Sequence, residues 1–254
     1  MTTTLPAPGQ EHEARPVRRR DSGYWSRRGT TIQVGEVPAG AVNLNVDGRR
    51  VVGPLQGFGR LWQRTYRVRL CGAATTPAEV VRLWKERFPE FLPAQSRFFP
   101  TMAGVRPGEV VLIHASITGM PVDTGVIVLY ADDESFTLMT PQGHPESGWN
   151  TFSASSEDGC TVAQIQSIGR ANDPIYELGF RLLGSRAQER IWRHVLIALA
   201  AHYGVDEPVQ ARKTLVDPRL QWSQARNVWH NAMIRSMLYT IASPLRRVRR
   251  PARR

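Results

Sequence analysis

The sequence predicts an α+β fold in which a curved antiparallel β-sheet wraps around a long C-terminal α-helix, with one extra helix after it. Two observations lead to this prediction. Five short segments rich in β-branched and aromatic residues follow one another with only turn residues between them. One long amphipathic stripe comes after them. Consecutive strands without helices between them form an antiparallel meander, so we expect a sheet that packs on a single long helix.

The first predicted strand covers residues 60–70 and shows the period of two that is typical of a half-buried strand. Trp62, Tyr66, Val68 and Leu70 share one of its faces. Gly, Pro or Asp-Asp turns bound each of the five strands of the meander. These five predicted strands cover residues 109–116, 123–131, 135–140, 149–155 and 160–170.

Two helices of different length flank the meander. Thr76-Pro-Ala-Glu79 is a capping box with proline at the first helical position, and it predicts a short helix over residues 77–88. Apolar positions recur at helical spacing over residues 174–203, with a kink expected at Gly184. A helix of that length spans about 45 Å, which is enough to cross the whole sheet.

Composition divides the chain into four parts. Residues 1–30 combine Pro, Gly, Thr and charges without hydrophobic periodicity, which predicts a disordered basic arm. Residues 31–208 hold the sheet and the long helix. Residues 209–243 form a predicted helical extension, with its helix over 219–242, and residues 244–254 form an Arg-rich tail.

The net charge of +11 lies mostly at the two ends of the chain. The first 30 residues contribute +3 and residues 244–254 contribute +6, so residues 31–211 are close to neutral. A nucleic-acid reader carries its basic residues on a folded surface, so we expect no specific nucleic-acid partner. The Arg tail either is a solvated end or makes weak, salt-sensitive contact with anionic membranes.

The two cysteines, Cys71 and Cys160, lie far apart and in no metal-ligand spacing. We therefore expect free, reduced thiols of the kind found in a cytoplasmic protein. The N-terminus lacks the apolar segment of a signal peptide, and no run of about eighteen apolar residues occurs. The sequence thus predicts a cytoplasmic protein, and it leaves the oligomeric state unknown.

The run from Gly143 to Gly148, Gly-His-Pro-Glu-Ser-Gly, resembles the Gly-His-Pro-Glu-x-Gly strand turn of uncharacterised bacterial proteins in the START-like, or SRPBCC, superfamily. The resemblance extends over residues 59–204, and residues 222–230 look like an extension of one branch of that superfamily. It implies a helix-grip fold, related to the Bet v-like proteins. Relatives bind lipids, sterols, polyketides or plant hormones between sheet and helix, and a minority are cyclases or hydrolases. The resemblance therefore implies a pocket and leaves the chemistry open.

His144 and Glu146 form the sharpest candidate site for catalysis. They lie two residues apart in an extended turn, where the imidazole could exchange protons near neutral pH and the carboxylate could orient it. The alternative is a rigid hairpin connection, in which His144 caps backbone carbonyls and Glu146 pairs with a surface arginine.

Six further residues are candidates for ligand contact. We expect four aromatic side chains and the inner stripe of the long helix to line an apolar cavity. Arg170 either binds a carboxylate or phosphate at the cavity mouth or pairs with Asp173 or Glu177, and a strand histidine either faces the cavity or is a satisfied core residue. These six candidates are Trp62, Tyr66, His114, Trp149, Phe152 and Arg170.

No nucleotide-binding, zinc-protease or serine-hydrolase motif occurs, so we expect no cofactor and no metal. Three hypotheses stay open: a protein that binds an apolar or amphipathic small molecule, a cyclase- or hydrolase-type enzyme that uses His144 and Glu146, and a membrane- or partner-associated protein that acts through its last helix and Arg tail. Whether the chain is an enzyme is uncertain from the sequence.

Overall fold

The computed structural model describes residues 22–27, 29–117 and 119–248, with side-chain positions for all of these except 183–187 and 243–248. Nine strands form one antiparallel sheet in the order β3-β4-β5-β6-β7-β8-β2-β9, and β1 pairs with β6. The strands are β1 Val51–Val52, β2 Leu61–Leu70, β3 Ser96–Phe99, β4 Val110–Ile117, β5 Met120–Ala131, β6 Ser135–Pro141, β7 Glu146–Glu157, β8 Cys160–Ala171 and β9 Gln210–Asp217.

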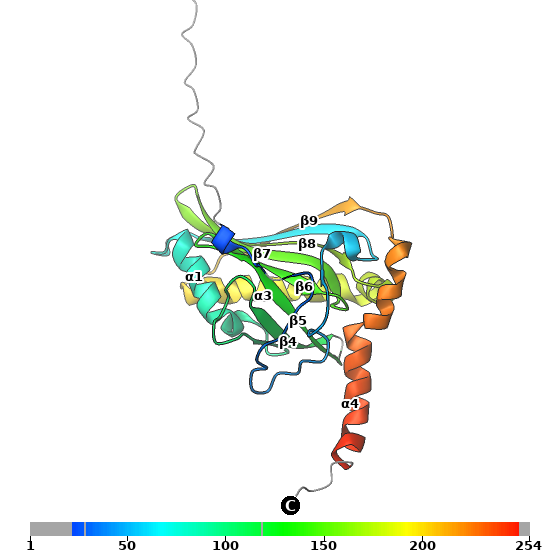
Figure 1. Ribbon diagram of the computed structural model, residues 1–254. Helices are drawn as coiled ribbons and strands as arrows, with labels where there is room; N and C mark the ends of the chain where they lie inside the picture. Colours follow the sequence, from blue (N-terminus) through cyan, green and yellow to red (C-terminus); the bar gives the residue numbers. More distant parts are fainter. Residues whose placement is uncertain (1–21, 28, 118, 249–254) are drawn as a thin grey trace, which may run out of the picture.

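The long helix lies along one face of this sheet, as Figure 1 shows. The α+β helix-grip arrangement is confirmed, with a further helix, α4, whose first turns pack against β5, where Ser236 Oγ accepts from the Asp123 N–H. The predicted kink at Gly184 is a π-helical segment, which divides the long helix into α2 and α3. The helices are α1 Pro77–Arg87, α2 Pro174–Gly179, α3 Ser185–His202 and α4 Ala232–Val248, with shorter helical turns at Ser22–Tyr24, Pro54–Gln56, Phe88–Phe91, Phe180–Gly184 and Trp222–His230.

Local sequence signals fix the starts of two helices. The Thr76 side chain accepts from the Glu79 N–H, and the Glu79 carboxylate accepts from the Thr76 N–H, which completes the predicted capping box. Asp173 caps α2 by accepting from the N–H groups of Ile175 and Tyr176. These caps set where α1 and the long helix begin relative to the sheet.

The predicted helical extension over residues 209–243 needs correction in its first half. Residues 210–217 form β9, which pairs with β2 and extends the sheet. Trp222–His230 is a 3₁₀-helix, and the α-helix begins only at Ala232. Strand β9 is exposed along nearly its whole length, so it has no apolar alternation that the sequence could reveal.

The predictions of a disordered arm and a basic tail also need correction, because the described parts of both segments form secondary structure. Ser22–Tyr24 forms a helical turn, and Trp25 forms a bridge with Tyr130 of β5. At the other end, α4 continues to Val248. Residues 1–21 and 249–254 lie outside the described residues.

The expectation of free thiols is wrong, because Cys71 and Cys160 form a disulfide bond. The pairing of β2 with β8 places Leu70 opposite Thr161, so the two cysteines that follow and precede them meet. Within the described part of the chain, no helix is long and apolar enough to cross a membrane. The cytoplasmic location stays a prediction, and it no longer has the support of free thiols.

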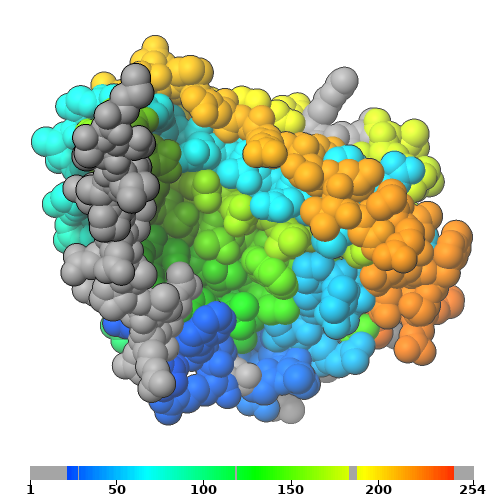
Figure 2. All heavy atoms as spheres, turned by 90° about the horizontal axis from the view of Figure 1, so that it is seen from above, coloured from blue at the N-terminus to red at the C-terminus, as the bar shows by residue number. Residues whose placement is uncertain are grey.

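The two faces of the sheet are covered differently. On the inner face, α1 and α3 enclose the main apolar core. On the outer face, residues 30–52 cover β4, β5 and β6 and bury a smaller cluster that includes Ile32, Val46 and Leu112. The outer face of β8, β2 and β9 stays open, and Figure 2 shows it as a hollow beside the gold β9.

Candidate functional site

Two neighbouring rows of side chains cross the inner face of the sheet, and their compositions differ sharply. The strand register sets Phe136, Phe152, Ile165 and Tyr66 side by side on β6, β7, β8 and β2. We call this set the aromatic row. All four side chains are buried, and the Phe136 and Phe152 rings stack at 4.7 Å between centroids. This half of the interior is therefore filled by apolar packing.

Two residues further along the same strands, the register places Asn150, Ser167, Arg64 and Lys213 side by side on β7, β8, β2 and β9. We call this set the polar row. Ser167 is fully buried, Arg64 is 5% exposed and Asn150 is 8% exposed. Burying a polar group costs free energy unless the group has a hydrogen-bond partner. Each buried group of the polar row is therefore expected to have one.

Arg64 finds its partner in Glu146. Arg64 Nη1 donates to Glu146 Oε1 at 2.8 Å, and Gln188 Nε2 at the start of α3 donates to Glu146 Oε2 at 2.6 Å. A side chain at Gly169 would place its Cβ 2.6 Å from Glu146 Cγ, so glycine there leaves room for the carboxylate. The buried ion pair thus joins the sheet to the long helix.

Three buried polar atoms of the polar row have no hydrogen-bond partner in the described structure: Asn150 Oδ1, Ser167 Oγ and Arg64 Nε. A fully buried polar atom without a partner costs about 1–3 kcal/mol. Such atoms are usually met by ordered water or by a ligand. Other buried atoms also have no partner, and Trp84 Nε1 and Trp192 Nε1 lie on rings that contact Phe152, so the polar row is distinguished by holding three such atoms side by side.

A cavity of about 180 Å³ opens beside the polar row, between β2, β9 and the start of the long helix. We call it the mouth pocket. The Trp62 ring forms part of it, and Lys213 Nζ lies 4.0 Å from the centre of that ring. Its lining residues are Arg60, Trp62, Arg64, Ala171, Glu177, Phe180, Arg181 and Lys213.

The predicted partnership of His144 with Glu146 is not what the structure shows. The Glu146 carboxylate bonds to Arg64 and Gln188, whereas His144 Nδ1 contacts the main chain of Glu146 and accepts from its N–H at 3.1 Å. Burial lowers the pKa of His144 to about 4, so the imidazole is neutral at pH 7. This geometry fits a rigid hairpin connection, in which the Glu146 carboxylate pairs with an arginine inside the fold.

Three of the six predicted ligand-contact residues lie on the inner face. Phe152 and Tyr66 belong to the aromatic row and are buried in the core, where burial raises the pKa of Tyr66 to about 12. Trp62 is half-buried and lines the mouth pocket. Of the four aromatic residues that we expected to line a cavity, Trp62 is therefore the one that lines the mouth pocket.

The other three predicted residues lie on the outer face, which corrects their assignment to the cavity. Trp149 packs near Gly53, and His114 Nδ1 lies 2.7 Å from Asp123 Oδ1. Arg170 donates to the carbonyl oxygens of Gly59 and Arg219 and to Asp217 Oδ2, so it fastens the end of β9. The pairing with Asp173 or Glu177 that we considered does not form in the structure.

The sequence analysis missed Asn150, Ser167 and Gln188, but Arg64 did carry a signal. Arg64 shares the parity of Trp62, Tyr66 and Val68, so it is a charged residue in an otherwise apolar register. A lone charge on a buried strand face usually marks an ion pair or a binding site. Asn150 and Ser167 depend on the pairing of strands, and Gln188 depends on a contact between α3 and β7, neither of which the sequence displays.

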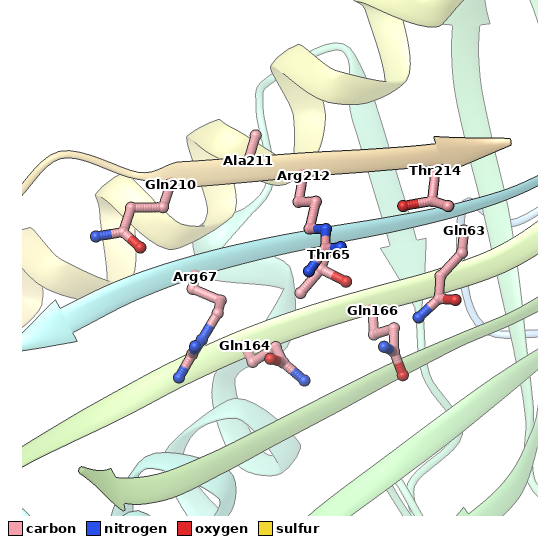
Figure 3. A pocket seen from close by; sticks show the side chains of 9 residues that line it. All are labelled: Gln63, Thr65, Arg67, Gln164, Gln166, Gln210, Ala211, Arg212 and Thr214. Atoms are coloured by element: carbon pink, nitrogen blue, oxygen red, sulfur yellow. The ribbon is translucent and has the colours of Figure 1, made fainter.

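A second hollow of about 600 Å³ lies on the outer face of β8, β2 and β9. Figure 3 shows its side chains rising from these three strands, with four glutamine amides among them. It is polar and open, and its two arginines include Arg67, which pairs with Glu157. The lining residues are Gln63, Thr65, Arg67, Gln164, Gln166, Gln210, Ala211, Arg212 and Thr214.

No protein-family model matches the sequence, and no curated protein matches it significantly. Solved structures resemble the fold. The di-domain ARO/CYC protein StfQ from the steffimycin biosynthetic pathway matches with a TM-score of 0.44 and 11% identity over 57% of this chain and 51% of its own, so the match spans about half of StfQ. Ara h 8.0201 matches at 0.41 and 12% identity over 56% of this chain and 97% of its own.

A third similar structure is TTHA0849 from Thermus thermophilus, with a TM-score of 0.43 and 15% identity over 56% of this chain and 96% of its own. At such low identity these similarities concern the fold alone. Among the described residues, no three His, Cys, Asp or Glu side chains cluster as metal ligands would.

Proposed function

We propose that this protein binds an amphipathic small molecule at the polar end of its helix-grip interior, beside the mouth pocket. The observation that supports this most directly is the set of unpartnered buried atoms Asn150 Oδ1, Ser167 Oγ and Arg64 Nε in one row of the interior, of which Arg64 also lines the mouth pocket. Binding sites combine an apolar lining with a few convergent polar groups that orient the ligand. The polar row offers a donor and two acceptors, and the aromatic row borders it.

The catalytic hypothesis has no comparable support in the contacts. An acid–base pair needs its two side chains within hydrogen-bond reach of each other or of the substrate. His144 and Glu146 each bond elsewhere. We therefore propose binding without assigning a reaction.

Fluorescence of the neutral dye N-phenyl-1-naphthylamine tests the binding site. We expect the full-length protein to enhance the dye signal and the variant Ser167→Leu, which fills the polar row, to reduce the affinity at least tenfold. Gln166→Leu is the matched control, because Gln166 is the preceding residue of β8 and lines the outer hollow. Equal affinity of both variants and the parent would contradict the proposal.

Ser167→Leu adds volume at a fully buried position and could unfold the protein, so Asn150→Leu, which keeps the number of heavy atoms and the branching of the side chain, serves as a second variant. We expect it to fold and to weaken dye binding at least fivefold. In parallel, native mass spectrometry of protein purified from its own host should show a co-purifying small molecule. A folded Asn150→Leu variant with unchanged dye affinity would also contradict the proposal.

A specific observation supports a second role, in weak contact with anionic membranes. The most exposed large apolar side chains of the C-terminal extension are Trp222 at 71%, Trp229 at 78%, Leu238 at 61% and Ile241 at 70%. Residues 244–254 add six arginines and no acidic residue. Exposed apolar groups next to basic residues favour the surface of an anionic bilayer.

Co-sedimentation with vesicles tests this second role. We expect binding to phosphatidylcholine vesicles that contain phosphatidylserine, weaker binding at high salt, and none to phosphatidylcholine alone. Truncation after Ser243 should abolish the binding. Unchanged binding of the truncated chain at low and high salt would contradict a membrane role.

A further inference from the structure

The mouth pocket carries more positive than negative charge. Its lining includes four cationic side chains: Arg60, Arg64, Arg181 and Lys213. Two carboxylates face them, because Glu177 pairs with Arg181 and Glu146 pairs with Arg64. Arg60 and Lys213 have no ion pair in the described part of the chain. The pocket therefore holds two positive charges in excess.

Lys213, which has no ion pair in the described part of the chain, lies close to Arg64, which pairs with Glu146. Strand pairing places Lys213 directly opposite Arg64 on the neighbouring strand, and like charges in that position repel. Burial and the nearby Arg64 charge lower the pKa of Lys213, which is the expected effect of such crowding. An anion between these side chains would relieve the repulsion.

Buried donors also point to an anion. Arg60 Nε and Arg64 Nε are buried and have no hydrogen-bond acceptor in the described structure. Arginine binds carboxylate and phosphate oxygens with paired donors, and hydrogen bonds to an ionised acceptor are roughly twice as strong as neutral ones. Arg60 and Arg64 both line the pocket, so its wall contains arginines whose donors are not all satisfied within the described structure.

The pocket also has an aromatic wall and a modest size. Trp62 and Phe180 line it beside the cations. Its volume of about 180 Å³ is small beside the roughly 300–1,000 Å³ of a typical pocket for a drug-sized ligand. It suits an anionic end group with a small aromatic or apolar body.

We infer that the mouth pocket binds an oxyanion, a carboxylate or a phosphate, at the polar end of the ligand. This inference rests on the proposed function and adds the chemical class of the ligand. Arg60, Arg64 and Lys213 bind the oxyanion, and Trp62 packs against the body that carries it. Arg181, which is engaged with Glu177, lies at the exposed rim.

NMR titration of the full-length protein tests the inference through the indole N–H signal of Trp62, assigned with Trp62→Phe. Benzoate and phenyl phosphate should shift this signal with a Kd at least tenfold lower than that of neutral benzamide, which has the shape of benzoate. Inorganic phosphate is the third probe. If it binds as tightly as phenyl phosphate, the anion is the free ion; if it binds more weakly, the anion is part of a larger molecule.

Charge-matched variants assign the effect to the pocket. Lys213→Gln and Arg60→Gln should each weaken benzoate binding at least fivefold. Arg212→Gln should leave it within twofold, because Arg212 is adjacent on β9 and lines the outer hollow. Benzamide binding should not change in any variant.

Two results would overturn the inference while the proposed function survives. Benzamide could match benzoate in Kd, or Arg212→Gln could weaken benzoate as much as Lys213→Gln does. Either result would mean that the pocket has no preference for anions beyond the general positive charge of the protein. If neither the aromatic probes nor the neutral dye bound, the proposed function would fail as well.

Discussion

The aromatic row and the polar row lie on the same strands, two residues apart, and face the same long helix. In the aromatic row every side chain packs against others, and Phe152 alone contacts the rings of Trp84, Phe88, Phe136 and Trp192. In the polar row three buried atoms have no partner within the described structure. The proposed function thus assigns stability to the aromatic row and ligand binding to the polar row, where unsatisfied polar groups cost stability.

The largest expected effect comes from the aromatic row. Phe152→Ala should lower the free energy of unfolding by about 3–5 kcal/mol, because it removes a fully buried ring and leaves a cavity. Urea denaturation measures this change. Dye affinity of the folded fraction should stay within about threefold, and a tenfold loss of affinity would show that the two rows do not act separately.

A similar loss of stability is expected when one partner of the buried Arg64–Glu146 ion pair is replaced. Arg64→Met should cost about 3–5 kcal/mol, because it leaves the buried Glu146 carboxylate without its counter-charge. The double variant Arg64→Met/Glu146→Gln should recover most of this stability, yet it should not recover benzoate binding. Equal stability of the single and double variants in urea denaturation would contradict the role of this pair.

The disulfide fastens the end of β2 and β8 that lies beyond the aromatic row. Replacing both Cys71 and Cys160 by alanine should cost about 2–4 kcal/mol, because the bond closes a loop between residues 89 positions apart. Ligand binding should stay unchanged. A reducing agent should lower the Tm of the parent protein and leave that of the double variant unaffected; a parent Tm insensitive to reduction would contradict the assignment.

His144 is expected to make the stability of the protein depend on pH. Its pKa of about 4 in the folded protein lies below the reference value of 6.5, so the unfolded chain takes up the proton first as the pH falls. Stability should therefore fall between pH 6.5 and pH 4, by at most about 3 kcal/mol. Asn at this position can still accept from the Glu146 N–H, so His144→Asn should flatten this part of the profile. Parallel profiles of parent and variant would contradict the burial of a neutral imidazole.

Much of the fold could be predicted, because its strands are half-buried and its helices carry caps. The five strands of the meander and the capping box at Thr76 illustrate this. Strand β9 escaped prediction, since it is exposed and lacks alternation. The disulfide escaped because it depends on the pairing of β2 with β8.

The site could be predicted only in part, and the reason lies in how the outer face is covered. Residues 30–52 pack on the outer face of the central strands, so both faces carry apolar residues there and parity does not reveal the inner one. Trp149 and His114 were assigned to the wrong face for this reason. Arg64, in contrast, stands out on a strand whose alternation is clear.

The central claim is that the polar row serves a ligand at some expense of stability, and one paired measurement tests it most directly. The double variant Ser167→Ala/Asn150→Leu removes two unpartnered buried atoms and should raise the free energy of unfolding by about 1 kcal/mol. The same variant should bind N-phenyl-1-naphthylamine at least tenfold more weakly. A variant that loses stability and keeps its dye affinity would show that these atoms support the fold, and the account would be contradicted.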